Sequence, residues 1–148
     1  MNDMMRNTLG KLLGRRPPAL QVGALCLDPP SGRVLLITSR GTGRWIIPKG
    51  WPMSGLSAAG AALREAWEEA GVEGKADETP LGHYHYDKQE GGGLNIPINV
   101  QVHLVRVSAL ADDFPEARDR KRAWFTPAEA APLVAEPELQ DLLRGFAP

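Results

Sequence analysis

A helix-forming segment enclosed by loops and glycine constrains the fold of this chain more than any other stretch. The sequence AAGAALREAWEEA, residues 58–70, is rich in helix formers, although Gly60 weakens it. Ser57 is placed to cap its first turn and Gly71 to end it. Three apolar residues at helical spacing predict the face that packs on a sheet: Leu63, Trp67 and Ala70. The loop KGWPMSG, residues 49–55, has no helical period and leads into this helix.

Three carboxylates gather on the predicted helix. Glu65, Glu68 and Glu69 are separated by three and four residues or adjoin, so their side chains converge on one patch. Like charges at this spacing repel one another, and a bound divalent cation would remove that penalty. Oxygen ligands of this kind suit Mg²⁺ or Mn²⁺, whereas zinc prefers His and Cys. Taken alone, the helix favours an ordinary solvated acidic face, with Arg64 and Glu68 as an i, i+4 ion pair.

The surroundings of the helix change this interpretation. Six residues are in register with the fixed positions of the Nudix box: Gly50, Arg64, Glu65, Glu68, Glu69 and Gly71. By this motif the chain is identified as a member of the Nudix hydrolases. The stretches RWIIPKGWPM, residues 44–53, and RKRAWFTPAEA, residues 120–130, resemble the diphosphoinositol polyphosphate phosphohydrolase branch and its bacterial relatives. The resemblance extends over residues 19–134.

The resemblance implies a fold and a reaction. The implied fold is an α/β/α sandwich, a mixed sheet between helices, with the box as a loop–helix–loop. The implied reaction is hydrolysis of a diphosphate linked to another group, with Mg²⁺ or Mn²⁺ as cofactor. Glu65 and Glu69 would be the main metal ligands, and Glu68 a further ligand or the carboxylate that activates water. The carbonyl of Gly50 would be an additional ligand, and Arg64 would orient a carboxylate.

Leu56 departs from the box, because it stands where the motif has its first glutamate. Leucine can neither bind a metal nor accept a hydrogen bond. An alternative is therefore a catalytically weakened Nudix domain that senses a nucleotide or phosphate ligand. In that case the basic N-terminal segment or the RDRKR patch, residues 118–122, would serve a partner.

Phosphate recognition is expected from basic residues outside the helix. The resemblance favours Ser39, Arg40 and Arg44 on the loop before the box. Lys49, beside Gly50, would reach a phosphate or be solvated. In ARDRKRAW, residues 117–124, strand alternation would put Arg120 and Arg122 on one face, although a charged loop is as often merely solvated. The planar fork of arginine suits polyphosphate oxygens.

Other polar residues are weaker candidates. In HYHY, residues 83–86, one pair should face the core and the other the solvent or the cleft, and ordinary strand packing is favoured. His103 is expected to be a strand residue rather than a ligand. Glu90 and Glu116 are candidates for an extra carboxylate near the metals.

The remaining elements follow from apolar runs and turn residues. Strands are expected over residues 19–28 and 33–40 as a hairpin, and over 45–48, 81–89, 98–110 and 123–125. Helices are expected within residues 126–134 and 136–146, and loops over 90–97 and 111–122. This order of strands and helices predicts the α/β class, an α+β arrangement with a mixed sheet.

Composition limits the remaining possibilities. The 148 residues suit one domain, which we expect over residues 19–148 after a mobile arm at 1–18. A net charge of −1 gives no field that favours a nucleic acid polymer or an anionic membrane. The single cysteine, Cys26, is expected to be buried packing. Because no apolar run reaches about 18 residues and no signal peptide is recognised, a cytoplasmic location is expected. A monomer and a homodimer are both compatible with the sequence.

The substrate class follows from the resemblance alone. Dinucleoside polyphosphates and diphosphoinositol polyphosphates are favoured, as small-molecule partners of an enzyme that hydrolyses phosphoric anhydride bonds. Another nucleoside diphosphate derivative is the alternative among hydrolases.

Overall fold

The computed structural model describes residues 18–148, so the predicted arm lies outside the described residues except for Pro18. Its strands are β1 (Ala19–Asp28), β2 (Arg33–Thr38), β3 (Trp45–Ile46), β4 (Lys49–Gly50), β5 (Val72–Ala76), β6 (Gly82–Glu90), β7 (Leu94–Leu110) and β8 (Arg122–Phe125). Its α-helices are α2 (Ala58–Ala70), α3 (Pro127–Ala130) and α4 (Pro137–Gly145), with 3-10 turns at Gly91–Gly93 and Ala131–Leu133. Among the described residues, no helix is both long and apolar enough to cross a membrane.

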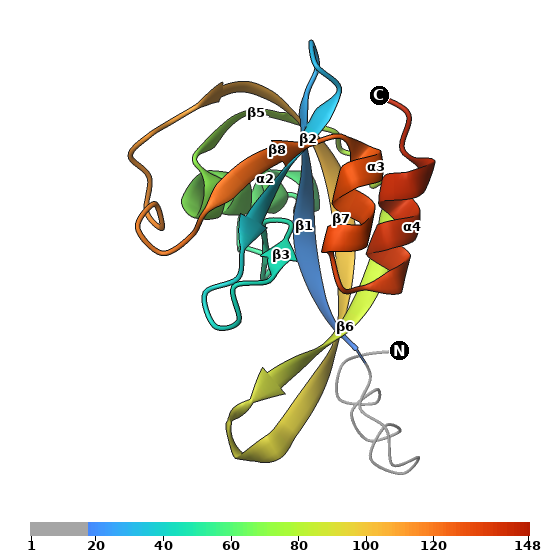
Figure 1. Cartoon of the computed structure of the whole chain (residues 1–148). Helices are drawn as coiled ribbons and strands as arrows, with labels where there is room; N and C mark the ends of the chain where they lie inside the picture. Colours follow the sequence, from blue (N-terminus) through green and yellow to red (C-terminus); the bar gives the residue numbers. More distant parts are fainter. Residues whose placement is uncertain (1–17) are drawn as a thin grey trace.

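The strands form one mixed sheet (Figure 1). Its main path runs β3-β2-β1-β7-β5, while β4 pairs with β1, β6 with β7 and β8 with β2. β1 and β7 are parallel from Ala19↔Ile98 to Leu27↔Arg106, and the other pairs are antiparallel. The predicted mixed sheet is therefore confirmed.

Helices cover both faces of this sheet, with α2 on one side and α3 and α4 on the other (Figure 1). Alternate residues of β1 enter two separate cores, so Leu25 packs with α4 residues while Ala24 and Cys26 pack with α2. A strand buried on both faces has to be apolar throughout, which explains the sequence VGALCL. The expected burial of Cys26 is confirmed, and burial raises the pKa of its thiol to about 12.

Helix α2 begins and ends where the sequence predicts. The Ser57 hydroxyl accepts from the Gly60 backbone N–H at 3.0 Å, and Gly71 adopts φ 70° at the C-terminal end. The expected buried face is wrong in part, because Leu63 and Trp67 are only half-buried. The residues that pack on the sheet are mostly alanines, including Ala61, Ala62, Ala66 and Ala70, and Leu63 packs against the same core. Small side chains let the helix lie close to β1, and Trp67 lies to its side.

Three strand assignments differ from expectation. The predicted antiparallel hairpin of β1 and β2 forms, but it pairs only at Leu27↔Val34 and Asp28↔Arg33, because β4 pairs with β1 further along at Val22 and Gly23. β2 also pairs with β8. The short strands β4 and β5 were not expected, since KG and VEGKA lack an apolar pattern. The β6–β7 hairpin continues through the predicted loop at 90–97, and only the three glycines at Gly91–Gly93 turn the chain.

Candidate active site

The carboxylates of α2 lie against β4. The Lys49 backbone N–H donates to Glu69 Oε1 at 2.9 Å, which ties the strand to the helix. A Cβ atom on Gly50 would lie 2.6 Å from Glu65 Oε2 and closer still to its other carboxyl atoms. The backbone of Gly50 therefore rests directly on the Glu65 carboxylate, and only glycine allows this approach.

Burial and the charges of neighbouring residues shift the pKa values of these carboxylates. Burial, followed by the charges of Glu69, Glu68 and Glu116, raises the pKa of Glu65 to about 7. Burial also raises the pKa of Glu69, although Arg120 and the hydrogen bond from Lys49 oppose that rise. A cluster that resists ionisation in this way favours a bound cation.

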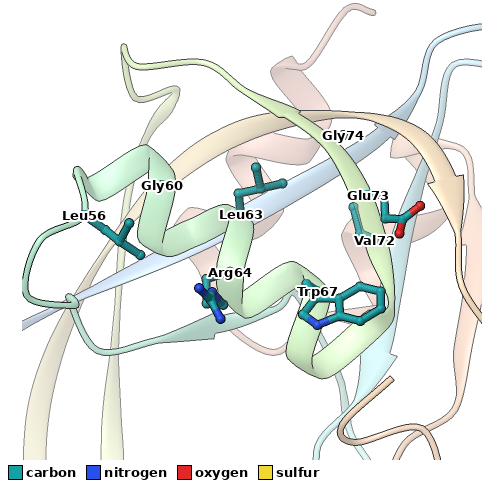
Figure 2. Close-up of a pocket in the computed structure, with 8 residues that line it drawn as sticks. All are labelled: Leu56, Gly60, Leu63, Arg64, Trp67, Val72, Glu73 and Gly74. Carbon is teal, nitrogen blue, oxygen red and sulfur yellow. The ribbon is translucent and has the colours of Figure 1, made fainter. Parts of the chain in front are cut away.

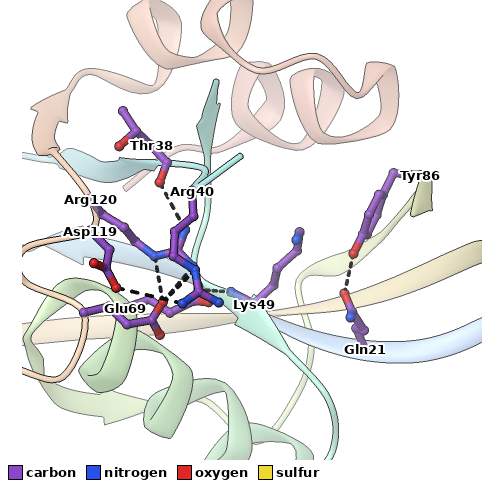
Figure 3. Close-up of polar contacts among 9 residues, drawn as sticks. Gln21, Thr38, Arg40, Lys49, Glu69, Tyr86, Asp119 and Arg120 are labelled. Atoms are coloured by element: carbon purple, nitrogen blue, oxygen red, sulfur yellow. Dashed lines mark hydrogen bonds and ion pairs between the residues drawn. The ribbon is translucent and has the colours of Figure 1, made fainter. Parts of the chain in front are cut away.

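Arg120 joins two of the carboxylates (Figure 3). Its Nη2 donates to Glu69 Oε2 and to Glu116 Oε1, each at 3.0 Å, and its Nη1 donates to the Thr38 carbonyl at 3.0 Å. The Arg120 side chain is only 6% exposed. The Glu116 backbone N–H donates to the Glu68 carbonyl at 3.0 Å. The loop at 111–121 thus brings Glu116 into the acidic cluster from far along the sequence.

The structure does not bring Arg64 to this cluster. Arg64 is exposed and lies with Leu56, Leu63 and Trp67 around a separate apolar cavity of about 510 Å³ between α2 and β5 (Figure 2). Among the described side chains, Arg64 makes no ion pair with Glu68 or another carboxylate. The orienting role expected of Arg64 has no contact to support it.

A basic cleft of about 380 Å³ adjoins Glu116. It is lined by the end of β2, the following loop and the 118–121 segment, including Ser39, Arg40, Arg118, Arg120 and Lys121. Arg40 Nε lies 3.4 Å from Glu116 Oε1, so one side of the cleft opens on the carboxylate cluster. Arg44 donates to the Thr42 hydroxyl at 3.2 Å, and its Nη1 lies 3.8 Å from Glu136 Oε1.

Lys49 and Arg122 have different environments. Burial lowers the pKa of Lys49, whose Nζ lies 4.6 Å from the centre of the Tyr86 ring. Arg122 Nη1 donates to the Ala70 carbonyl at 2.7 Å, and its guanidinium lies 5.0 Å from the centre of the Phe114 ring. Arg120 and Arg122 thus both reach α2, but Arg122 binds the C-terminal end of the helix, away from the basic cleft.

The remaining candidates are placed as follows. Tyr84 is buried and Tyr86 half-buried, while His83 and His85 are exposed, so the two pairs face opposite sides as expected. His85 Nδ1 contacts Glu138 Oε1 at 2.9 Å. His103 is buried in β7 and bonds the Asp77 carbonyl at 2.8 Å, which confirms a packing role. The side chain of Glu90 lies outside the part of the chain that the structure describes.

Comparison with known proteins identifies the family. The model of the NUDIX domain matches residues 17–146. The chain belongs to the Nudix family. Nudix hydrolase 12 of Arabidopsis thaliana, named as mitochondrial, is 31% identical over 120 residues, which cover 76% of this chain and 57% of that protein. Human diphosphoinositol polyphosphate phosphohydrolase 3-beta is 33% identical over 124 residues, which cover 80% of this chain and 71% of that protein.

Solved structures agree on the fold. A NUDIX hydrolase from Nitrosomonas europaea has a TM-score of 0.65 at 22% identity, over 86% of this chain and 87% of that one. The Ap4A hydrolase of C. elegans has a TM-score of 0.57 at 22% identity, over 86% and 95%. The Nudix fold predicted from the box is confirmed. By family, the chain is assigned to the pyrophosphohydrolases that act on phosphoric anhydride bonds.

Nudix hydrolases use divalent metal ions, and the acidic cluster fits such an ion. Its donors are hard oxygen atoms. Burial and then the neighbouring carboxylates raise the pKa of Glu65, and a bound cation would favour its ionised form. Among residues 18–148, no three acidic, histidine or cysteine side chains already surround one point. Arg120 instead supplies the positive charge shared by Glu69 and Glu116.

Proposed function

We propose that this chain is a metal-dependent hydrolase that cleaves the diphosphate bond of a dinucleoside polyphosphate or a diphosphoinositol polyphosphate. The observation that carries the proposal is the acidic cluster of Glu65 and Glu69, which lies against Gly50 and opens beside a cleft lined by Ser39 and Arg40. Carboxylates next to arginines match a substrate that arrives with many phosphate oxygens and a divalent cation.

The residues divide into two groups by chemistry. Glu65, Glu68, Glu69 and the Gly50 carbonyl would hold Mg²⁺ or Mn²⁺. Such an ion supplies charge neutralisation of the phosphate oxygens and activation of water. Glu68, which is only partly buried, is suited to accept the proton of the attacking water as the new P–O bond forms.

Polar and basic side chains would bind the phosphate groups of the substrate. Ser39 and Arg40 line the basic cleft and would bind phosphate oxygens there, with Arg44 and Lys49 as further candidates. As the bond to the bridging oxygen breaks, the leaving phosphate gains negative charge, which Arg40 and Arg120 would stabilise. Arg120 can serve only after it releases Glu69 or Glu116, because its donors are engaged there. Arg122 is engaged at the end of α2, which favours a structural role.

Leu56 does not weaken this proposal. Its side chain is 43% exposed and lines the cavity on the Trp67 side of the helix, with Leu63 and Arg64 (Figure 2). The glutamate missing from the box therefore removes no member of the cluster built by Glu65, Glu69 and Glu116. A catalytic domain is favoured over a sensor for this reason.

Hydrolysis of a panel of diphosphates, followed by chromatographic separation of the products, tests the proposal. The panel contains diadenosine polyphosphates, diphosphoinositol pentakisphosphate, ADP-ribose and nucleoside triphosphates, each with Mg²⁺, Mn²⁺ or a chelator. Turnover with metal and none with chelator is expected. Glu69→Gln and Glu65→Gln should each lower kcat by about 100-fold or more, as removal of a charge-stabilising group does. Glu73→Gln, an exposed change on β5, serves as the matched control.

The opposite results have distinct meanings. Persistent activity in both glutamine variants would show that the assigned cluster is not the catalytic site. Tight binding of one compound without turnover of any would establish the sensor instead.

A further inference from the structure

One buried carboxylate near Arg44 does not belong to the acidic cluster of Glu65, Glu69 and Glu116. Glu136, immediately before α4, is 7% exposed. Its Oε1 lies 3.8 Å from Arg44 Nη1, and its Oε2 is buried with no hydrogen-bond partner among the described residues. Buried carboxylate oxygens are almost always paired, because an unpaired one carries the full cost of desolvation.

The groups around Glu136 belong to the site. Its charge raises the pKa of Lys49, opposing the larger effect of burial, and it also raises the pKa of Tyr86. Glu69 acts on the same two groups. Geometry places it there as well, because Arg44 belongs to the loop that lines the basic cleft, where the Ser39 backbone N–H donates to the Arg44 carbonyl at 2.8 Å. Glu136 therefore lies beside this loop, 3.8 Å from Arg44 Nη1.

Neither neighbouring cation satisfies this carboxylate. A distance of 3.8 Å to Arg44 is too long for a hydrogen bond. The Lys49 ammonium lies over the Tyr86 ring at 4.6 Å. The Glu136 side chain also makes no capping hydrogen bond to α4. Among the described residues, none donates a hydrogen bond to Glu136 Oε2.

The chemistry of the unpaired oxygen selects its ligand. A carboxylate repels phosphate oxygens, and a heavily phosphorylated inositol ring presents little else. A nucleoside presents neutral donors, namely base N–H groups and ribose hydroxyls. Arg44, whose side chain is 49% exposed, can move to a phosphate and free the carboxylate edge that it covers. Rotation about the terminal side-chain bond then presents either oxygen.

We propose that Glu136 is a specificity-determining residue that accepts a hydrogen bond from the nucleoside part of the substrate. It selects nucleoside polyphosphates over inositol polyphosphates. This inference rests on the proposed diphosphate hydrolysis and names the substrate class of the same site.

Variant kinetics test the inference. Glu136→Gln keeps the size of the side chain and removes its charge, and Glu136→Asp keeps the charge but withdraws it by one methylene. KM and kcat are measured for diadenosine pentaphosphate and for diphosphoinositol pentakisphosphate. Glu136→Gln should raise KM for the dinucleotide about tenfold, the difference between a charged and a neutral acceptor, with kcat within about twofold. The KM for the inositol compound should stay constant or fall.

Controls separate this role from general support of the site. Glu138→Gln, two residues later on an exposed position of α4, should leave both KM values unchanged. Thermal melting identifies variants that fold poorly, and Glu136→Asp then provides the test, with an intermediate KM expected. Equal KM increases for both compounds would mean that Glu136 only positions Arg44 and Lys49, and would overturn the inference. Unchanged KM values would overturn it as well.

A binding measurement separates the inference from the proposed function. Calorimetric titration with ADP is carried out on the wild-type chain and the Glu136 variants. If the wild-type chain hydrolyses no diphosphate, the proposed function fails, but about tenfold weaker ADP binding in Glu136→Gln would still support nucleoside recognition. Identical ADP affinities would contradict it.

Discussion

At the scale of single residues, Gly50 sets the geometry of the site. A methyl group there would overlap the Glu65 carboxylate, so Gly50→Ala must push Glu65 or β4 aside. We expect this variant to lose at least about tenfold in kcat, because small misplacements of reacting groups cost that much or more. Its melting temperature should change little, since the overlap is with the end of a side chain. Kinetics measure the effect on kcat and thermal melting the effect on stability. Both are compared with Gly55→Ala, at a loop glycine that has open space around it but φ 82°. An alanine variant of Gly50 with wild-type kcat would contradict the packing argument.

Which side chains meet was predictable from the sequence where local spacing decides it. Glu65 and Glu69 meet because helical spacing requires it. Arg64 adjoins Glu65 in the sequence, yet its side chain lies on another side of the helix. The box pattern alone does not predict that orientation. The contact of Arg120 with Glu69 joins residues 51 positions apart and depends on how the 111–121 loop folds. Glu136 had no local motif, and only its burial and unpaired oxygen reveal it.

At the scale of elements, the C-terminal end of α2 is stabilised by Arg122. The guanidinium donates to the Ala70 carbonyl, a free acceptor at the helix end, and its charge favours the helix dipole. Arg122→Ala should therefore lower the free energy of unfolding by about 1–3 kcal/mol. KM should change less than about twofold, because the side chain is engaged away from the cleft. Urea unfolding and steady-state kinetics check both values, with Arg118→Ala in the cleft as the comparison. A large rise in KM without loss of stability would restore Arg122 to the substrate site.

A helix or strand was predictable when its own sequence carries the signals that define it. Helix α2 carries its own cap, its own stop and a run of helix formers, so its bounds were expected correctly. The strands β4 and β5 carry no such signal, because their pairing is supplied by β1 and β7. The predicted β1–β2 hairpin forms, but the further pairing of β2 with β8 was not expected for the same reason, since the paired β8 residues lie 85 or more positions later in the chain.

At the scale of the whole molecule, the site forms where three segments come together, and contacts with the sheet set the position of each. α2 packs on β1 through alanines, β4 pairs with β1, and the 111–121 loop returns to β2 and α2. Because the sheet fixes all three, the carboxylates remain close together despite their repulsion. The fold therefore stabilises a charge cluster that the helix alone would disfavour, and we expect stability to depend on pH and on divalent cations.

The pH dependence of stability follows from Glu65 and Glu69. The pKa of Glu65 is about 7 in the folded chain against an ordinary 4.5, and that of Glu69 is also raised. The folded chain therefore binds more protons than the unfolded chain between these values. The stability that these two carboxyls contribute is expected to be fully present below about pH 4.5 and to be lost as the pH rises to about 7. The loss should be about 1 kcal/mol after allowance for the partial exposure of Glu65.

A divalent cation should reverse this loss, because it binds the ionised carboxylates of the folded chain. Melting temperatures measured from about pH 5 to pH 8 should fall with a chelator and stay level or rise with Mg²⁺. Glu65→Gln should flatten the chelator curve, because it removes the group with the raised pKa, whereas Glu73→Gln should leave the curve unchanged. If Mg²⁺ stabilises the chain equally at both ends of this range, its binding is not linked to ionisation of Glu65 and Glu69, and the cluster is not where it binds.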